Sequence, residues 1–275
     1  MTDENTILLG AAVGAGAAVA NKAYDDLVHP AAKEIGQGLG FAGLLFKTIM
    51  QDCYHGADSL RKKCKQFIKK TEETIGSIPP ERRIEPSLGV LQPIIAGSWG
   101  ALDSDLLQAL FLNLLKSAMD KNSSAGVLPV YGELIKQITP DEALILVFLK
   151  KYPDIHPTIN VGIQRTSPNI AYRIILEKLS LLQKYVKVEY PQNIPIYLEN
   201  LSRLGFISID FSAEAVIANR YKEIEELPEV IAIQQSIKEN NEEHYFFQHG
   251  IFKLTNFGKA FCKICISDQT VATFL

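Results

Sequence analysis

The first half of the chain shows a helical pattern of apolar residues. Between residues 105 and 119 apolar side chains recur three and four positions apart, which is typical of an amphipathic helix. The apolar stripe is wide, so we expect this helix to lie at the centre of a core, with Asp103 or Ser104 as its N-cap. The stripe comprises Leu106, Leu107, Leu110, Phe111, Leu114, Leu115 and Ala118.

Further helices are predicted on both sides of this one. Residues 47–75 carry amphipathic spacing and no proline, and Pro79-Pro80 ends that helix because proline disfavours the helical conformation in the residue before it. A helix follows over 86–97, with a kink or a new start at Pro93, and a short one over 130–138. Thr139 then begins a helix, since Pro140 suits its first position and Glu142 completes a capping box.

The second half of the chain changes character. Helices are predicted over 171–187 and 194–204, and residues 206–211 alternate apolar and polar like a half-buried strand. A polar, acidic insertion at 214–243 precedes a strand or tight hairpin at 245–254 and a last helix from 255 to 266. This order resembles a winged helix with a long wing.

The predicted fold is therefore mainly α, with an N-terminal helical bundle and a C-terminal winged-helix-like α/β domain. We divide the chain into Gly/Ala-rich and amphipathic helices at 1–78, a helical core region at 79–138, and the winged-helix-like domain with its acidic wing insertion at 139–275. With 47% hydrophobic and 21% charged residues in 275, the composition is globular and excludes a disordered protein. Four cysteines exclude a disulfide scaffold and fit a reducing compartment.

Two uncharged apolar runs, 7–20 and 35–46, dominate the N-terminal region. The first has 14 residues, fewer than the roughly 20 that span a bilayer, and no basic residue precedes it as in a secretory signal. Their glycines have the spacing of closely packed helices. Packed helices, a hairpin that perturbs a membrane and a membrane anchor all stay open. The candidate membrane or partner contacts are Ile7, Leu8, Gly10, Gly14, Gly36, Gly40, Leu44, Leu45 and Phe46.

Charge is distributed unevenly around a short basic stretch. Residues 1–60 hold 3 Lys/Arg against 7 Asp/Glu, whereas residues 61–85 hold 8 against 4. Such a stretch is either a solvated helix face or a surface for anionic lipid or an acidic partner. Its candidate residues are Arg61, Lys62, Lys63, Lys65, Lys69 and Lys70.

Three sequence blocks within residues 78–148 carry a family resemblance. They read PPERRIEPSLGVLQPII, DLLQALFLNLLKSAMD and YGELIKQITPDEALIL. Together they resemble the abortive infection alpha (Abi-alpha) family of bacterial proteins. The resemblance implies a role in phage defence, in the bacterial cytoplasm or at the inner face of its membrane. It brings no catalytic residues.

The function predicted from these observations is non-enzymatic phage defence, with membrane perturbation by the N-terminal apolar runs as its mechanism. The partners we consider are an unidentified protein, a membrane surface and a second copy of the chain. The main alternative is a soluble protein-interaction module of a defence system. A winged-helix DNA-binding regulator is the weaker alternative, because the helix at 194–204 offers only Asn200 and Arg203 for base contacts and the insertion is acidic.

No cofactor or metal site is predicted. Cys262 and Cys265 have C-x-x-C spacing, and His244 and His249 precede them, but the cysteines share helical spacing with core residues, so a buried helix face is favoured over zinc or redox chemistry. The glycines from Gly10 to Gly16 resemble a nicotinamide-binding turn without the alternating strands and helices of that fold.

Overall fold

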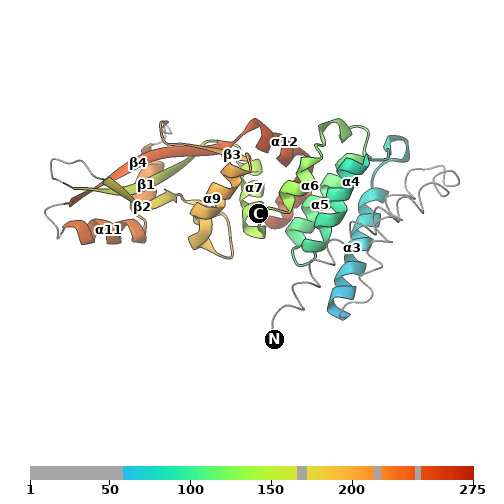
Figure 1. Cartoon of the computed structure of the whole chain (residues 1–275), viewed down its shortest axis with the longest axis horizontal. Helices are drawn as coiled ribbons and strands as arrows, with labels where there is room; N and C mark the ends of the chain where they lie inside the picture. Colours follow the sequence, from blue (N-terminus) through green and yellow to red (C-terminus); the bar gives the residue numbers. More distant parts are fainter. Residues whose placement is uncertain (1–57, 166–171, 214–217, 239–242) are drawn as a thin grey trace, which may run out of the picture. The chain divides into compact units, whose positions relative to one another are not determined.

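The computed structural model describes residues 58–165, 172–213, 218–238 and 243–275 (Figure 1). The chain divides into two compact units. One contains Met1–Gln137, described from residue 58, together with Lys263–Ser267; the other contains Ile138–Cys262 and Asp268–Leu275. The described part is mainly helical, as predicted from the sequence. The predicted segments 1–78, 79–138 and 139–275 stay a prediction, as does the winged-helix arrangement.

The first unit is helical. It contains α3 (Asp58–Gly76), the short 3₁₀ turn η2 (Pro80–Arg82), α4 (Leu88–Gly100), α5 (Asp105–Met119), η3 (Ser124–Gly126) and α6 (Val130–Ile135). Helix α5 packs against α3, α4 and α6, so the wide apolar stripe is central to this core as predicted. The Ser104 side chain caps α5 by accepting from the Leu107 amide at 3.2 Å. Pro93 lies inside the single helix α4, so it starts no new helix.

The second unit combines helices with a sheet. Its chain order is α7 (Pro140–Lys151), β1 (His156–Arg165), β2 (Tyr172–Leu179), α8 (Leu182–Tyr185), η4 (Pro191–Asn193), α9 (Ile194–Arg203) and β3 (Ile207–Asp210). The insertion follows as α10 (Ala218–Glu225) and α11 (Pro228–Lys238), and then β4 (Glu243–Leu254), α12 (Asn256–Cys265) and α13 (Asp268–Phe274). Helix α12 contributes its last three residues to the first unit.

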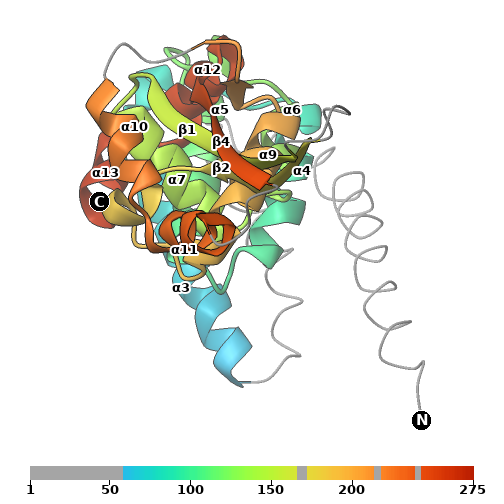
Figure 2. The same cartoon turned by 90° about the vertical axis from the view of Figure 1, so that its left-hand side faces the viewer.

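The four described strands form one antiparallel sheet in the order β2-β1-β4-β3. The insertion helices cover one face, α10 against β1 and α11 against β4 (Figure 2). The apolar cluster between them includes Ile159, Val161, Ile224 and Val230. On β4, the direct neighbour of Gly162 is Phe246, whose ring occupies the space where a side chain at 162 would stand, so a larger residue there would have to displace this ring.

The predicted helix over 171–187 is wrong. Residues Tyr172–Leu179 form strand β2, and only Leu182–Tyr185 are helical. Ile174 and Leu176 are spaced as in a strand and Leu176 and Leu179 as in a helix, so spacing alone does not decide between the two; register shifts in the pairing with β1 accommodate the odd step. Pairing with β1, which buries Leu176 and Leu179 against the insertion helices, decides between them. By contrast, the helix at 194–204, the strands at 206–211 and 245–254 and the helix from 255 are confirmed as α9, β3, β4 and α12.

Candidate functional site

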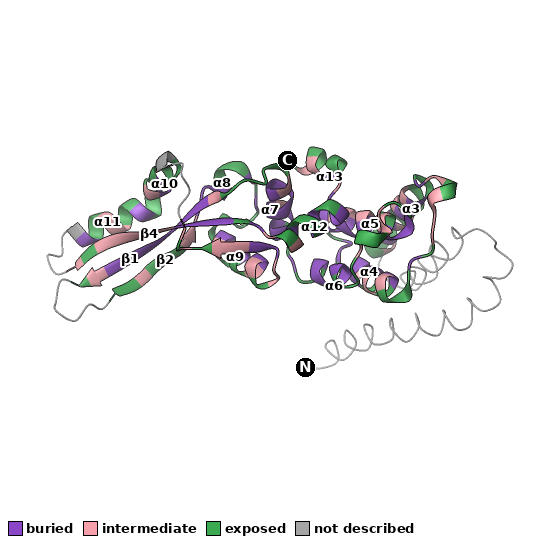
Figure 3. Ribbon diagram, turned by 90° about the horizontal axis from the view of Figure 1, so that it is seen from above, coloured by how far each residue is buried: buried purple, intermediate pink, exposed green. Residues whose placement is uncertain are grey.

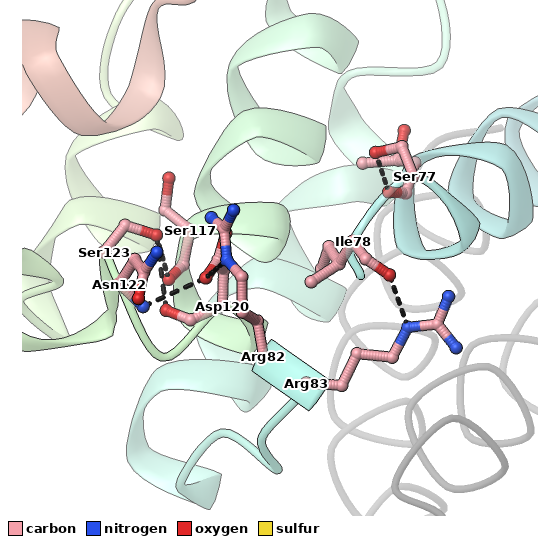
Figure 4. A network of polar contacts seen from close by, with 9 residues as sticks. Ser77, Ile78, Arg82, Arg83, Ser117, Asp120, Asn122 and Ser123 are labelled. Carbon is pink, nitrogen blue, oxygen red and sulfur yellow. Dashed lines mark hydrogen bonds and ion pairs between the residues drawn. The ribbon is translucent and has the colours of Figure 1, made fainter. Parts of the chain in front are cut away.

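The connector between α3 and α4 is held by a set of contacts that we call the connector clasp, made of Arg82, Arg83 and Asp120. The Arg82 guanidinium donates to both carboxylate oxygens of Asp120, through Nε at 3.0 Å and through a terminal nitrogen (Figure 4). Arg83 bonds back to the C-terminal side of α3: a terminal nitrogen donates to the Gly76 carbonyl at 3.1 Å, and Nε donates to the Ile78 carbonyl, two residues past the helix, at 2.7 Å. The middle of the connector is therefore tied to the end of α3 and to the end of α5 within the first unit.

Asp120 is the centre of the clasp. Its side chain is 8% exposed, whereas that of Arg82 is 39% exposed. It also accepts from the Asn122 amide at 3.0 Å, and the backbone of the connector bonds to the same turn, with the Lys121 amide donating to the Arg82 carbonyl at 2.9 Å. Hydrogen bonding from Arg82 holds the pKa of Asp120 below its ordinary value, against the opposing effect of burial. The clasp thus ties the end of α5 to the connector through one buried charge.

The start of α7 carries a second polar cluster, the carboxylate hub, made of Asp141, Glu142, Tyr197 and Asn200. The predicted capping box is confirmed: Thr139 caps the Glu142 amide, and the Glu142 carboxylate accepts from the Thr139 amide at 2.6 Å. The other Glu142 oxygen accepts from the Asn200 side chain of α9 at 2.7 Å. Glu142 therefore caps the start of α7 and also binds a side chain of α9.

Asp141 does more than favour the helix terminus. It is buried, and it accepts from the amides of Glu189 and Tyr190 at 2.8 and 3.1 Å and from the Tyr197 hydroxyl at 2.9 Å. Desolvation by burial raises the pKa of Tyr197, so this phenol stays protonated as a donor. Local sequence patterns do not reveal these contacts, because the donors lie 48 to 56 residues away along the chain.

The structure places the basic stretch on α3. Two of its lysines bond to the start of α5: Lys63 to Asp103, and Lys70 to Asp105 at 2.8 Å. Lys69 lies 3.8 Å from Glu73, and Arg61 lies 3.6 Å from Asp58. Part of the basic charge is therefore used to hold α3 against α5. The membrane or partner role of the whole set, Lys62 and Lys65 included, stays a prediction.

The predicted apolar contact residues from Ile7 to Phe46 lie outside the described residues. Within the described ranges no helix is long and apolar enough to span a membrane. These findings leave membrane contact by the N-terminal runs as a prediction.

The proposed DNA-contacting residues point into the carboxylate hub. Asn200 donates to Glu142, and the Arg203 guanidinium donates to the Asn200 carbonyl oxygen at 2.7 and 3.1 Å. For these side chains to contact DNA bases, the hydrogen bonds from Asn200 to Glu142 and from Arg203 to Asn200 would have to break.

The C-x-x-C pair is part of the core. Cys262 and Cys265 are buried free thiols, and burial raises the pKa of the Cys262 thiol to about 12. A thiol of that pKa is neither a nucleophile nor a ready metal ligand at neutral pH. His249 bonds instead to Glu225 at 2.7 Å and stacks on Tyr221. In the described residues no group of three His, Cys, Asp or Glu could hold a metal.

The fold and these clusters define a mainly helical protein of two units. In each unit, charged side chains of the connector clasp or of the carboxylate hub join segments that lie next to each other. The chain belongs to the abortive infection alpha family, whose model matches residues 59–265. This confirms the resemblance seen in the sequence blocks. No curated protein matches the chain.

A solved structure, an uncharacterized protein from the hydrocarbon-degrading marine bacterium Alcanivorax borkumensis SK2, shows a partial similarity. It is 12% identical, with a TM-score of 0.34, over 50% of this chain and 93% of that chain.

Proposed function

We propose that this chain acts in abortive infection, as a non-enzymatic phage-defence protein that works by binding. One observation carries the non-enzymatic part. The charged residues of the family-like blocks hold backbone and neighbouring helices: Arg82 with Asp120, Thr139 with Glu142, and Asp141 with the segment before α9. In these contacts the charged groups hold each of the two units together internally, which supports a function without catalysis by them.

The second unit supports a role in binding. We propose that it is a winged-helix-like protein-interaction module: β3 follows α9 directly, and β4 returns antiparallel to β3 after an insertion in place of a simple wing. The insertion carries the exposed acidic residues Glu223 on α10, Glu229 on α11 and Glu226 in the turn between these helices, and they favour a protein partner over a phosphate backbone. We place the protein in the bacterial cytoplasm or at the inner face of the membrane.

Phage infection of a bacterial strain that expresses the chain tests this function. We expect the culture to survive at a low ratio of phage to cells and to collapse at a high ratio. For Glu142→Gln and Asp120→Asn, we expect protection to fall only as far as the melting temperature falls. The core variant Ile145→Val supplies the matched control, because it lowers stability by about 1 kcal/mol without touching a charge. A carboxylate variant that loses protection while keeping its stability would show that this carboxylate acts in the protective function itself, and would overturn its purely structural role.

Membrane perturbation by the N-terminal runs is the mechanism we propose for the effect, because residues 7–20 and 35–46 are uncharged and apolar. We predict that the full chain floats with liposomes of anionic lipid and releases an entrapped dye. A buried charge is costly in lipid, so Gly14→Glu and Leu44→Glu should abolish release while the circular dichroism spectrum is unchanged. The exposed substitution Lys259→Glu is the control. Unchanged release in both variants would exclude membrane action by these runs.

A further inference from the structure

Strand β2 is an open edge of the sheet in the second unit. It pairs with β1 on one side and with no other described strand on the opposite side (Figure 3). Tyr172 is 66% exposed and Ile175 is 39% exposed, although both are large apolar side chains. Helix α9 packs against this strand, and its Glu199 lies 3.4 Å from Lys178 near the end of β2. No described strand pairs with the outer side of β2 over Tyr172–Glu177, so this part of the strand can offer backbone groups and apolar surface to another strand.

The middle of β2 is poorly matched to β1. Register shifts leave Ile175 and Glu177 without an opposite residue on β1, whereas Ile174 and Leu176 face Gly162 and Val161. Exposure alternates along the same stretch: Arg173, Ile175 and Glu177 are exposed, and the residues between them are half-buried. Arg173, Ile175 and Glu177 therefore lie on the same face of the strand, with the apolar Ile175 between a positive and a negative side chain.

The two charges that flank Ile175 on this edge, Arg173 and Glu177, have opposite signs. Within the chain Arg173 lies 3.8 Å from Glu243 and Glu177 accepts from Lys178 at 2.7 Å, so a second copy would share or exchange these pairs. Natural edge strands are commonly protected by charged side chains, especially lysine, and by bulges. If two copies of β2 pair antiparallel with Ile175 opposite Ile175, each Arg173 comes to lie opposite Glu177 of the other copy. Such a pairing forms two opposite-charge cross-strand pairs around an apolar pair, and each of these stabilises the pairing.

We propose that β2 is a homodimer interface, in which two copies of this chain join their sheets through antiparallel β2 strands centred on Ile175. The twofold axis passes through the Ile175 pair, as an interface made of the same patch on both subunits requires. The two sheets then form one continuous sheet, and the apolar edge residues leave water. Other occupants of the edge, such as a different protein strand, are outcomes of the tests below.

Charge reversal tests the register by sedimentation of the full chain. We expect the wild type to form a dimer. Arg173→Glu and Glu177→Arg each place like charges opposite one another twice, and each should raise the dimer dissociation constant about tenfold. The double variant Arg173→Glu/Glu177→Arg restores opposite charges and should return the constant to within about twofold of the wild type. Lys259→Glu and Glu229→Arg, exposed on α12 and α11, are the matched controls.

Two results would overturn the proposal. One is a wild-type chain that sediments as a monomer at every concentration. The other is a double variant that dimerises no better than the single ones, because a different protein or a different register would not be restored by the swap. Thermal unfolding of each variant shows that the fold is retained.

Cross-linking tests the same axis independently. In a Cys53→Ser background, Ile175→Cys places two thiols opposite each other across the axis, within the range of a disulfide. We expect rapid oxidation to a disulfide-linked dimer. Tyr172→Cys is the control, because position 172 lies opposite position 178 of the other copy. Equal cross-linking of the two variants would contradict the pairing centred on Ile175.

Discussion

Asp141→Ala is expected to lower the free energy of unfolding of the second unit by about 3–5 kcal/mol. The carboxylate is the common acceptor for two backbone amides and the Tyr197 hydroxyl, and it is only 8% exposed. Alanine leaves all three donors without this acceptor: the Tyr197 hydroxyl is in a buried bond, and the amides of Glu189 and Tyr190 are in part-buried ones. Urea unfolding followed by hydrogen exchange in α7 and α9 measures the loss in this unit.

Two further variants separate the contributions of the hub. Tyr197→Phe removes one donor and leaves the backbone bonds, so it should cost about 1 kcal/mol. Asp154→Ala replaces an exposed aspartate in the same unit and should change stability by less than about 0.5 kcal/mol. An Asp141→Ala protein as stable as the Asp154→Ala protein would show that the three bonds contribute nothing to folding.

Local signals in the sequence were enough to predict most helices. The capping box at Thr139, the cap at Ser104 and the wide stripe of the helix at 105–119 are set by residues within one or two turns of each other. Gly205, directly after α9, has a φ of 79°, the left-handed conformation that glycine commonly adopts at the end of a helix. Where neighbours along the chain decide the conformation, the prediction succeeded.

Tertiary pairing decided the places where the prediction failed. Residues Tyr172–Leu179 carry apolar positions compatible with helix and strand, and only the pairing with β1 selects the strand. Residues His156–Arg165, to which no element was assigned, are buried over most of their length and form the central strand β1. A strand buried on both faces lacks the alternation that reveals a half-buried one.

The candidate clusters could be predicted only in part. Glu142 was assigned to the capping box, which is correct but leaves out its contact to Asn200 on α9. Nothing near Asp141 in the sequence reveals Tyr197, and nothing near Asp120 reveals Arg82, which lies 38 residues earlier. Both cases depend on the approach of segments that are distant in the chain.

Arg82→Ala is expected to destabilise the first unit by about 3 kcal/mol at pH 7, because Asp120 is then a buried charge without its partner. Trp99, the single tryptophan, is half-buried on α4 in the same unit, so its fluorescence follows the unfolding of this unit in urea. Arg82→Lys keeps the charge but cannot form the two-pronged contact, and it should recover part of the loss.

The pH dependence distinguishes the ion pair from simple packing by Arg82. In the wild type the pKa of Asp120 is held below its ordinary value of 3.8, chiefly by the hydrogen bond from Arg82. The stabilisation is therefore fully present above pH 3.8 and is lost as the pH falls through the lower native pKa. The Arg82→Ala protein has no such ion pair to lose in acid. The difference in free energy of unfolding between the wild type and Arg82→Ala should therefore shrink from pH 7 to pH 3. A difference that stays constant over this range would mean that Arg82 stabilises the connector through its aliphatic stem alone.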